Sequence, residues 1–420
     1  FYYLYLLLHS LLNHQIINIA FYQSRQPVYY LGNLFLGLSV LDFQQIKDSI
    51  SSSPAFILNA DEIINTLKTL NTLRHRSRCK VLYSIKSLPL LSVLELVKPF
   101  VDGFSVSSLF EARLANEVLA GQGDIHLTTP GIKPDEWDDI TRLITHLSFN
   151  STTQYQRFSA TAKTSVSIGL RVNPKLSFLK DNRFDPCCPY SKLGIDIDEL
   201  WQSSCIDQVK GLHIHNVFSA TDFIPLIKTI EKLRSYFGKS LAQLEWLNLG
   251  GGYLFNQIPD HRPFIDLVSQ LKKDFNLDVY IEPGKAVVGS AGYLVSTVID
   301  SFVSDGKTIA ILDTSVNHNP EVFEYQRQPE LHEHDAKGSY SAILAGCTCL
   351  AGDVFGEYQF SKPLAVGDKV IFKNIGAYSL IKANRFNGHN FPDIYSIQNQ
   401  HVKKLKHYPY QDYRQQWLAD

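Results

Sequence analysis

The feature that most constrains the fold is a series of eight short apolar segments, separated by helical patterns, in the first two thirds of the chain. The segments are Val81–Ile85, Gly103–Val106, Ile125–Thr128, His146–Phe149, Val166–Arg171, Gly211–His215, Trp246–Leu249 and Val279–Glu282. Strand and helix that alternate eight times are typical of a (β/α)8 barrel. We therefore predict an α/β fold of this TIM type, with a doubly wound parallel sheet as the alternative.

Two of the segments between these runs carry clear helix signals. Ser108 and Glu111 have the spacing of a capping box, in which each side chain accepts a hydrogen bond from the backbone near the other residue. The second segment follows Thr221 and Asp222, and Gly238 closes it. Its apolar stripe has helical spacing: Leu226, Ile230, Leu233 and Phe237.

The pattern changes after residue 287, where turn signals separate strand-like runs with little helical periodicity. These runs are Tyr293–Val298, Thr308–Leu312, Tyr340–Leu344 and Lys369–Phe372. We predict three parts for the chain: a leader of unknown role over 1–53, a barrel over 54–286, and a mostly-β C-terminal domain over 287–420.

The leader lacks the features of a membrane anchor or a secretory signal. Phe1–Leu8 is apolar, but His9, Asn13 and His14 soon interrupt it. A spanning helix needs about 20 mostly apolar residues, and a signal peptide needs a basic start and a small-residue cleavage site. We therefore expect no membrane association.

The net charge limits which partners the protein can bind, and the number and spacing of its cysteines indicate its cellular compartment. Forty basic and 41 acidic side chains leave a net charge of −1, which argues against a nucleic-acid-binding surface. The chain has six cysteines and no C-x-x-C pair. A disulfide framework is therefore not expected, and the cytoplasm is the predicted location.

Chemically distinctive residues follow the predicted strands at the end where barrel enzymes build their active sites. They are Lys86, Arg171, His215, the run Gly250–Gly252, and Glu282 with Gly284. Each has an ordinary alternative role, such as a solvated lysine, a tight glycine turn, a core histidine or an ion-paired glutamate. Together they offer an amine, a phosphate cradle, a flat ring and a carboxylate. These are the groups that bind pyridoxal phosphate.

Six motifs then make a family resemblance specific. The chain resembles the alanine-racemase-like pyridoxal-phosphate decarboxylases, and within them the carboxynorspermidine and carboxyspermidine decarboxylases, from Pro54 onward. The motifs are Y-S-I-K-S (Tyr83–Ser87), S-V-S-S-x-x-E (Ser105–Glu111), G-L-H-I-H-N (Gly211–Asn216), L-G-G-G-Y (Leu249–Tyr253), E-P-G (Glu282–Gly284) and G-C-T-C-L-A-G-D (Gly346–Asp353). Diaminopimelate decarboxylases resemble the chain less at two of them.

This resemblance implies how the barrel would bind the cofactor. Lys86 would hold pyridoxal phosphate as a Schiff base, and His215 would stack on its ring. Glu282 would pair with the ring nitrogen. The phosphate would be bound by the amides of Gly250, Gly251, Gly252 and Gly284 and by the hydroxyl of Tyr378.

The resemblance also implies a homodimer with shared active sites. Cys349 and Asp353 would reach the site of the partner subunit, where the thiol protonates the substrate carbon and the carboxylate holds a substrate amine. His318 and Glu321 match a segment that contacts substrate, and Glu324 is a weaker candidate. No metal site is predicted, because Cys347 and Cys349 make at most a half-site.

The chain departs from the family pattern at a few positions that bear on substrate choice. Lys192, Lys285, Asn319 and Glu321 stand where other residues are usual. The predicted reaction is decarboxylation of a carboxylated triamine. The alternatives are decarboxylation of diaminopimelate or ornithine, and a relative without activity that keeps the fold as a regulatory protein.

Overall fold

The computed structural model describes residues 29–31, 34–36, 41–203 and 205–419. The chain divides into two compact units, 1–50 and 51–420. In the first unit, β1 (Tyr29–Leu31) and β2 (Leu34–Leu36) pair antiparallel, and α2 (Phe43–Ser49) begins after its cap Asp42. Much of the predicted leader, including Phe1–Leu8, lies outside the described residues. None of the helices described is long and apolar enough to cross a membrane.

The second unit contains the predicted barrel, and all eight predicted strands are present. They run parallel, and the pairing of β12 with β4 closes the ring. The strands are β4 (Lys80–Ser84), β5 (Gly103–Val106), β6 (Asp124–Thr129), β7 (His146–Phe149), β8 (Ser167–Asn173), β10 (Gly211–Ile214), β11 (Trp246–Asn248) and β12 (Asp278–Ile281). A short strand, β9 (Ile195–Asp196), pairs parallel with the last residues of β8. The barrel prediction is confirmed, and the doubly wound alternative is wrong.

Helices alternate with these strands, as their periodicity predicted. They are α3 (Ala60–Ser77), α4 (Leu91–Val97), α5 (Leu109–Leu119), α6 (Trp137–Leu143), α7 (Thr152–Phe158), α8 (Ile197–Ser203), α9 (Ile224–Phe237) and α10 (Arg262–Phe275). Ser108 caps α5, and its side chain accepts a hydrogen bond from the Glu111 amide at 3.3 Å. The four apolar stripe residues of α9 are all buried.

The C-terminal part forms a second, mixed sheet with the order β16-β15-β14-β13-β3-β18-β19, and β17 pairs with β13. Its strands are β3 (Ala55–Asn59), β13 (Gly292–Ser304), β14 (Lys307–Leu312), β15 (Tyr340–Ala345), β16 (Val354–Phe360), β17 (Lys369–Phe372), β18 (Asp393–Gln398) and β19 (His401–Lys406). Three short helices complete this part: α11 (Lys285–Val288), α12 (Glu321–Tyr325) and α13 (Tyr410–Trp417). The mostly-β character of the second domain is confirmed.

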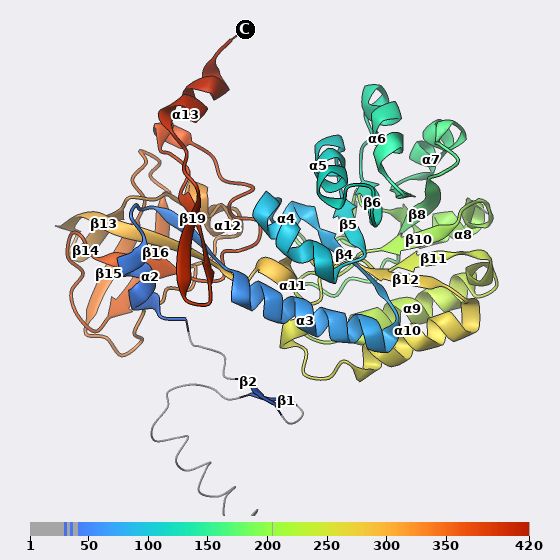
Figure 1. Cartoon of the computed structure of the whole chain (residues 1–420), viewed down its shortest axis with the longest axis horizontal. Coiled ribbons are helices and arrows are strands. Elements are labelled where there is room, and N and C mark those ends of the chain that lie inside the picture. Colours follow the sequence, from blue (N-terminus) through green and yellow to red (C-terminus); the bar gives the residue numbers. More distant parts are fainter. Residues whose placement is uncertain (1–28, 32–33, 37–40, 204, 420) are drawn as a thin grey trace, which may run out of the picture. The chain divides into compact units, whose positions relative to one another are not determined.

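One strand of the second sheet comes from residues that we predicted to belong to the barrel. β3 pairs antiparallel with β13 and parallel with β18. The eight barrel strands close without it, and its backbone hydrogen bonds are made in the second sheet instead. α3, which follows directly, contacts both β18 and α10, so it is one of the elements that link the sheet to the barrel (Figure 1).

Candidate active site

A cavity lies at the carboxyl ends of the barrel strands and collects most of the predicted cofactor residues. Its lining includes Lys86, His215, Gly251, Gly252, Glu282, Gly284 and Tyr378. These residues come from four strand ends of the barrel and from one loop of the second domain. The parallel strands bring them together, since their carboxyl ends all meet at one mouth.

Lys86 lies in the short 3-10 turn that follows β4, and its side chain is open to this cavity. The surrounding protein atoms partly desolvate its amine, which lowers its pKa, and the nearby Arg171 lowers it further. Glu282 and Glu111 act in the opposite direction. A lysine with a lowered pKa has a larger fraction of the neutral, nucleophilic amine.

His215 follows β10, and the glycine turn after β11 fixes the orientation of its ring. The Gly251 amide donates a hydrogen bond to His215 Nδ1 at 3.1 Å. Burial holds the pKa of His215 well below its usual value, and the charges of Lys86 and Arg171 lower it further. The ring is therefore neutral. Since Nδ1 accepts a hydrogen bond, the hydrogen-bond network assigns the proton to Nε2.

The glycine turn leaves no room for side chains. A Cβ on Gly250 would lie 2.3 Å from the Ile214 carbonyl oxygen, and one on Gly252 would lie 2.3 Å from that of Val217. Both residues also have φ in the left-handed region, +67° and +94°. This arrangement requires glycine and leaves the turn without side chains beside the cavity, as a phosphate cradle needs.

Glu282 follows β12 and is only 5% exposed. Its Oε1 accepts a hydrogen bond from Asn248 Nδ2 at 2.8 Å, and its Oε2 lies 3.4 Å from His213 Nε2. Burial acts to raise the pKa of this carboxyl group, but the hydrogen bond from His213 and the charge of Lys86 lower it further than burial raises it. Burial lowers the pKa of His213. A neutral His213 therefore faces an ionised Glu282, which suits a carboxylate that binds a protonated ring nitrogen.

Tyr378 connects the second domain to the turn that carries Lys86. Its amide donates a hydrogen bond to the Ser87 carbonyl at 2.9 Å, and its side chain lines the cavity. Burial raises the pKa of its phenol to about 12, so the hydroxyl keeps its proton and can donate to a phosphate. A lysine, a cradle without side chains, a neutral imidazole and a buried carboxylate around one cavity fit pyridoxal phosphate.

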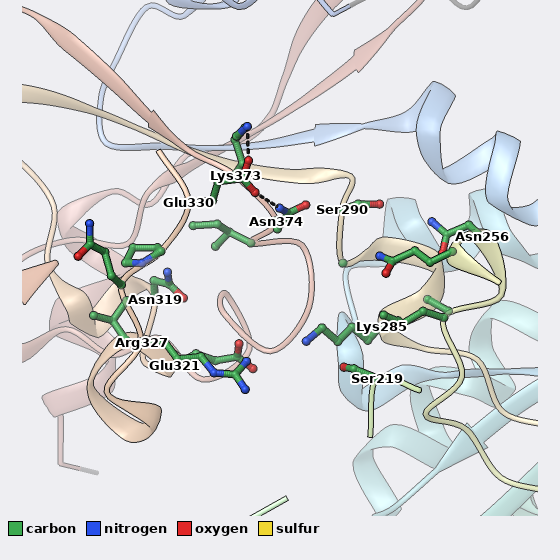
Figure 2. Close-up of a pocket in the computed structure, with 18 residues that line it drawn as sticks. Ser219, Asn256, Lys285, Ser290, Asn319, Glu321, Arg327, Glu330, Lys373 and Asn374 are labelled. Atoms are coloured by element: carbon green, nitrogen blue, oxygen red, sulfur yellow. Dashed lines mark hydrogen bonds and ion pairs between the residues drawn. The ribbon is translucent and has the colours of Figure 1, made fainter. Parts of the chain in front are cut away.

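A larger cavity of about 350 Å³ adjoins the first and shares Ser219, Leu254, Lys285 and Ala286 with it. Figure 2 shows Lys285 pointing from the barrel side toward Glu321 and Arg327. Burial raises the pKa of Glu321, although Lys285 opposes this effect. Glu321 Oε1 is buried and has no hydrogen-bond partner. This cavity therefore combines the basic side chains of Lys285 and Arg327 with a carboxyl oxygen of Glu321 that can accept a hydrogen bond from a ligand.

Three predicted residues of the second domain line neither cavity. Cys349 is exposed. Asp353 is buried, and its carboxylate accepts hydrogen bonds from the Val316 amide at 2.8 Å and the Thr348 amide at 3.1 Å. His318 is also buried, and desolvation lowers its pKa to about 4. The roles assigned to these three residues, like those of the barrel residues, stay predictions.

We did not assign a role to three buried residues that support the site, Arg171, His213 and Asn248. A usable signal existed for two of them. Side chains at positions i and i+2 of a strand lie on the same face. His213 therefore shares a face with His215, and Asn248 shares one with Gly250.

A cluster at the opposite end of the barrel was not predicted. Asp124, His126 and His146 bring potential metal-ligand atoms within 4.8 Å of one another. The two imidazole rings are stacked, with centroids 3.9 Å apart and planes inclined by 19°. A metal about 2.1 Å from a nitrogen of each ring would lie far outside both ring planes. Tyr280 also donates a hydrogen bond to Asp124 at 3.1 Å. We therefore assign the cluster to packing.

Comparison with known proteins establishes the class. A family model described as "Pyridoxal-dependent decarboxylase, C-terminal sheet domain" matches residues 13–376. The chain belongs to the pyridoxal-dependent decarboxylases, and its barrel and sheet are those of fold type III. The predicted family, enzyme class and cofactor are confirmed.

The most informative relatives act on carboxylated polyamines or related compounds. A carboxynorspermidine/carboxyspermidine decarboxylase of Campylobacter jejuni is 31% identical over 382 residues, which cover 86% of this chain and 97% of the relative. A carboxyaminopropylagmatine decarboxylase of Synechocystis is 32% identical over 369 residues, with 86% and 94% covered. The crystal structure of a Campylobacter jejuni carboxynorspermidine decarboxylase complexed with norspermidine has a TM-score of 0.79 at 29% identity, with 87% and 100% covered.

Proposed function

We propose that this enzyme decarboxylates carboxynorspermidine or carboxyspermidine, yielding norspermidine or spermidine. The observation that carries the proposal is the 31% identity to a decarboxylase of these substrates over almost its whole length. The cavity built around Lys86, His215 and Glu282 supports a pyridoxal-phosphate reaction at the barrel mouth.

In this proposal the barrel residues bind the cofactor and control its charge. Lys86 attaches it through the amine whose pKa desolvation lowers. His215 covers one face of the ring, and Glu282 keeps the proton on the ring nitrogen. The glycine amides and the Tyr378 hydroxyl hold the phosphate. When bound, pyridoxal phosphate supplies an electron-withdrawing ring that stabilises the carbanion left by carbon dioxide.

The second domain would supply the groups that act on the substrate, in part across a homodimer interface. Cys349 would protonate the carbanion from the partner subunit, and Asp353 would hold a substrate amine there. Two features support a partner: the Cys349 side chain is exposed, and it lines neither of the two cavities described above. Glu321, which lines the larger cavity, would contact the substrate from the same chain as Lys86. His318 belongs to the same substrate-contacting segment but lines neither cavity. The proposed location is the cytoplasm, in line with the six free cysteines.

Carboxyaminopropylagmatine is the second candidate substrate, because the Synechocystis relative is 32% identical. It differs from a carboxylated triamine in carrying a guanidinium group at one end. Lys285, one of the departures from the family pattern, lines both cavities and therefore bears on the choice between these substrate tails. Diaminopimelate and ornithine remain weaker alternatives.

A competition assay tests these proposals. Purified enzyme is given equal concentrations of carboxynorspermidine, carboxyspermidine, carboxyaminopropylagmatine, diaminopimelate, ornithine and lysine, and each product is quantified. We expect kcat/KM for a carboxylated triamine to exceed that for the three amino acids by about 100-fold, since each charge-assisted hydrogen bond adds about 1.5–3 kcal/mol. A preference for any other substrate would replace the proposal, and Lys86→Ala controls for background.

A further inference from the structure

The buried amide of Asn248 lies between two parts of the cofactor cavity that bind opposite ends of a ligand. Asn248 is the last residue of β11, and its side chain is completely buried. Its Oδ1 accepts a hydrogen bond from the Gly250 amide at 2.9 Å, and its Nδ2 donates to Glu282 Oε1 at 2.8 Å. One side chain therefore contacts both the glycine turn and the ring-nitrogen carboxylate.

The orientation of this amide is determined by its partners. If the amide were flipped, its oxygen would face the carboxylate oxygen, and its NH2 group would face the Gly250 N–H. Both hydrogen bonds would become repulsive contacts. The second hydrogen on Nδ2 points toward His126 Nδ1, at 3.5 Å. Asn248 thus has one arrangement that satisfies its buried polar atoms.

A backbone hydrogen bond alone does not fix the Glu282 carboxylate. The Glu282 amide donates to the Gly250 carbonyl at 2.8 Å, which holds the two backbones together. The side chain beyond Cβ can still rotate, and the His213 contact to the other carboxylate oxygen is longer, at 3.4 Å. The 2.8 Å bond from Asn248 is therefore the stronger restraint on the carboxylate.

We propose that Asn248 is a positioning residue of the cofactor site, which sets the distance between the Glu282 carboxylate and the phosphate-binding glycine turn. The inference rests on the proposed pairing of Glu282 with the ring nitrogen. The Asn248 amide would thus link the group that binds the ring nitrogen to the turn that binds the phosphate. A shift of the turn would then also shift the Glu282 carboxylate.

Two substitutions separate the two hydrogen bonds. Asn248→Leu has a similar size and removes both. Asn248→Asp keeps an acceptor for the Gly250 amide but replaces the donor to Glu282 with a second carboxylate oxygen. Two carboxylates about 3 Å apart in a buried site share one proton. This shared proton can substitute for the missing donor until rising pH removes it.

The primary measurement is the dissociation constant of the cofactor from the apo-protein, followed by absorbance between about pH 6 and pH 9 and divided by the wild-type value. We expect Asn248→Leu to weaken binding about 10- to 100-fold, with a ratio that does not change with pH, because it leaves a buried carboxylate without its donor. For Asn248→Asp we expect a ratio near one at low pH that rises about tenfold or more as the shared proton is lost.

The charged and titratable groups that face Glu282 influence the pH at which the shared proton is lost. They are Lys86 after β4, His126 on β6, Arg171 on β8, His213 on β10 and His215 after β10. Positive charge among them lowers the pH at which Glu282 and the carboxylate introduced by Asn248→Asp lose their shared proton. The range tested therefore extends on both sides of neutrality. Dividing each dissociation constant by the wild-type value at the same pH cancels the effect of the titration of these groups, because they are also present in the wild type.

Asn150→Leu is the matched control. Asn150 is a buried asparagine whose side chain, like that of Asn248, accepts one hydrogen bond and donates another; here both partners are backbone groups, the Gly194 amide at 2.9 Å and the Lys192 carbonyl at 2.8 Å. We expect it to lower the melting temperature of the apo-protein as Asn248→Leu does, while cofactor affinity stays within about twofold of wild type. If general loss of stability were enough to weaken cofactor binding, Asn150→Leu would lower both the melting temperature and the cofactor affinity.

Three outcomes decide the inference. Wild-type affinity in Asn248→Leu, or a flat ratio across pH in Asn248→Asp, overturns it. An equal loss of affinity in Asn150→Leu also overturns it, since the effect is then general destabilisation. Glu282→Gln serves as the reference for the proposed function: if it leaves cofactor affinity and absorption unchanged, the assignment of Glu282 fails, whatever the Asn248 variants do.

Discussion

The barrel mouth and the loops of the second domain differ in how their polar side chains are used. At the mouth, Lys86 and Glu282 line a cavity, and Asn248 and His213 orient the Glu282 carboxylate. In the second domain, the chain's own backbone occupies the Asp353 carboxylate, and Cys349 lines neither cavity. One chain thus brings the predicted cofactor residues together around one cavity, whereas Cys349 and Asp353 line neither cavity of their own chain, and we propose that they act in the site of a partner subunit.

The largest expected effect tests the barrel half. Lys86→Ala should remove the visible absorption band of the bound cofactor and reduce decarboxylation to background, because the variant lacks the amine that attaches the cofactor. Borohydride reduction should then leave the protein unlabelled. If the variant keeps both the band and the activity, another amine holds the cofactor and the comparison fails.

The next prediction concerns the second-domain half. Cys349→Ala should bind the cofactor as the wild type does but decarboxylate about 10²- to 10⁴-fold more slowly, since it lacks the positioned proton donor. Rates are measured by carbon dioxide release, and the protonated product is checked by mass spectrometry in deuterated water. A parallel loss of cofactor binding would place Cys349 in the barrel half instead.

Mixing the two inactive variants sharpens the comparison. With random pairing, half of the dimers combine Lys86→Ala with Cys349→Ala, and one of their two sites is intact. About a quarter of wild-type activity should therefore return. If subunit exchange is verified and no activity returns, each chain completes its own site.

A smaller effect is expected at Glu321, where the two halves meet. Burial raises the pKa of this carboxyl group, so as pH falls it takes up a proton at a higher pH than an ordinary glutamate does. Only the ionised form binds a substrate amine, and KM for a carboxylated triamine should rise as pH decreases. Glu321→Gln should raise KM about tenfold at high pH and remove this dependence. A KM that keeps the same pH slope in the variant would exclude Glu321 as the cause.

The smallest effect is on stability and involves His318. Its pKa is lowered from 6.5 to about 4 by burial. The unfolded chain therefore binds a proton that the folded chain does not bind between these values, and stability is lost as pH falls through this range. Linkage gives a loss of about 2 kcal/mol at about pH 5 relative to about pH 7. Urea unfolding should show this slope in the wild type and a shallower one in His318→Gln. Equal slopes would mean that His318 is not the responsible group.

The sequence predicted the parts of the fold that depend on local burial. The eight apolar runs became the eight barrel strands, and Lys86, His215 and Glu282 met at one mouth because parallel strands all end there. The motif of the second domain singled out Cys349 and Asp353, and their roles stay predictions. The motif did not predict where these two side chains lie relative to the cavity. A motif gives residue types, but it does not give the groups to which their side chains hydrogen-bond.

Other features were decided by tertiary structure alone. The run Ala55–Leu58 is as apolar as a barrel strand, and its place in the second sheet follows from which backbone edge remained open to it. Asn248 and Glu282 lie 34 residues apart in sequence, and nothing local pairs them. Periodicity records which side chains are buried, since burial depends on the residue itself. Which buried group contacts which depends on strand register and packing, and these exist only once the whole barrel has closed.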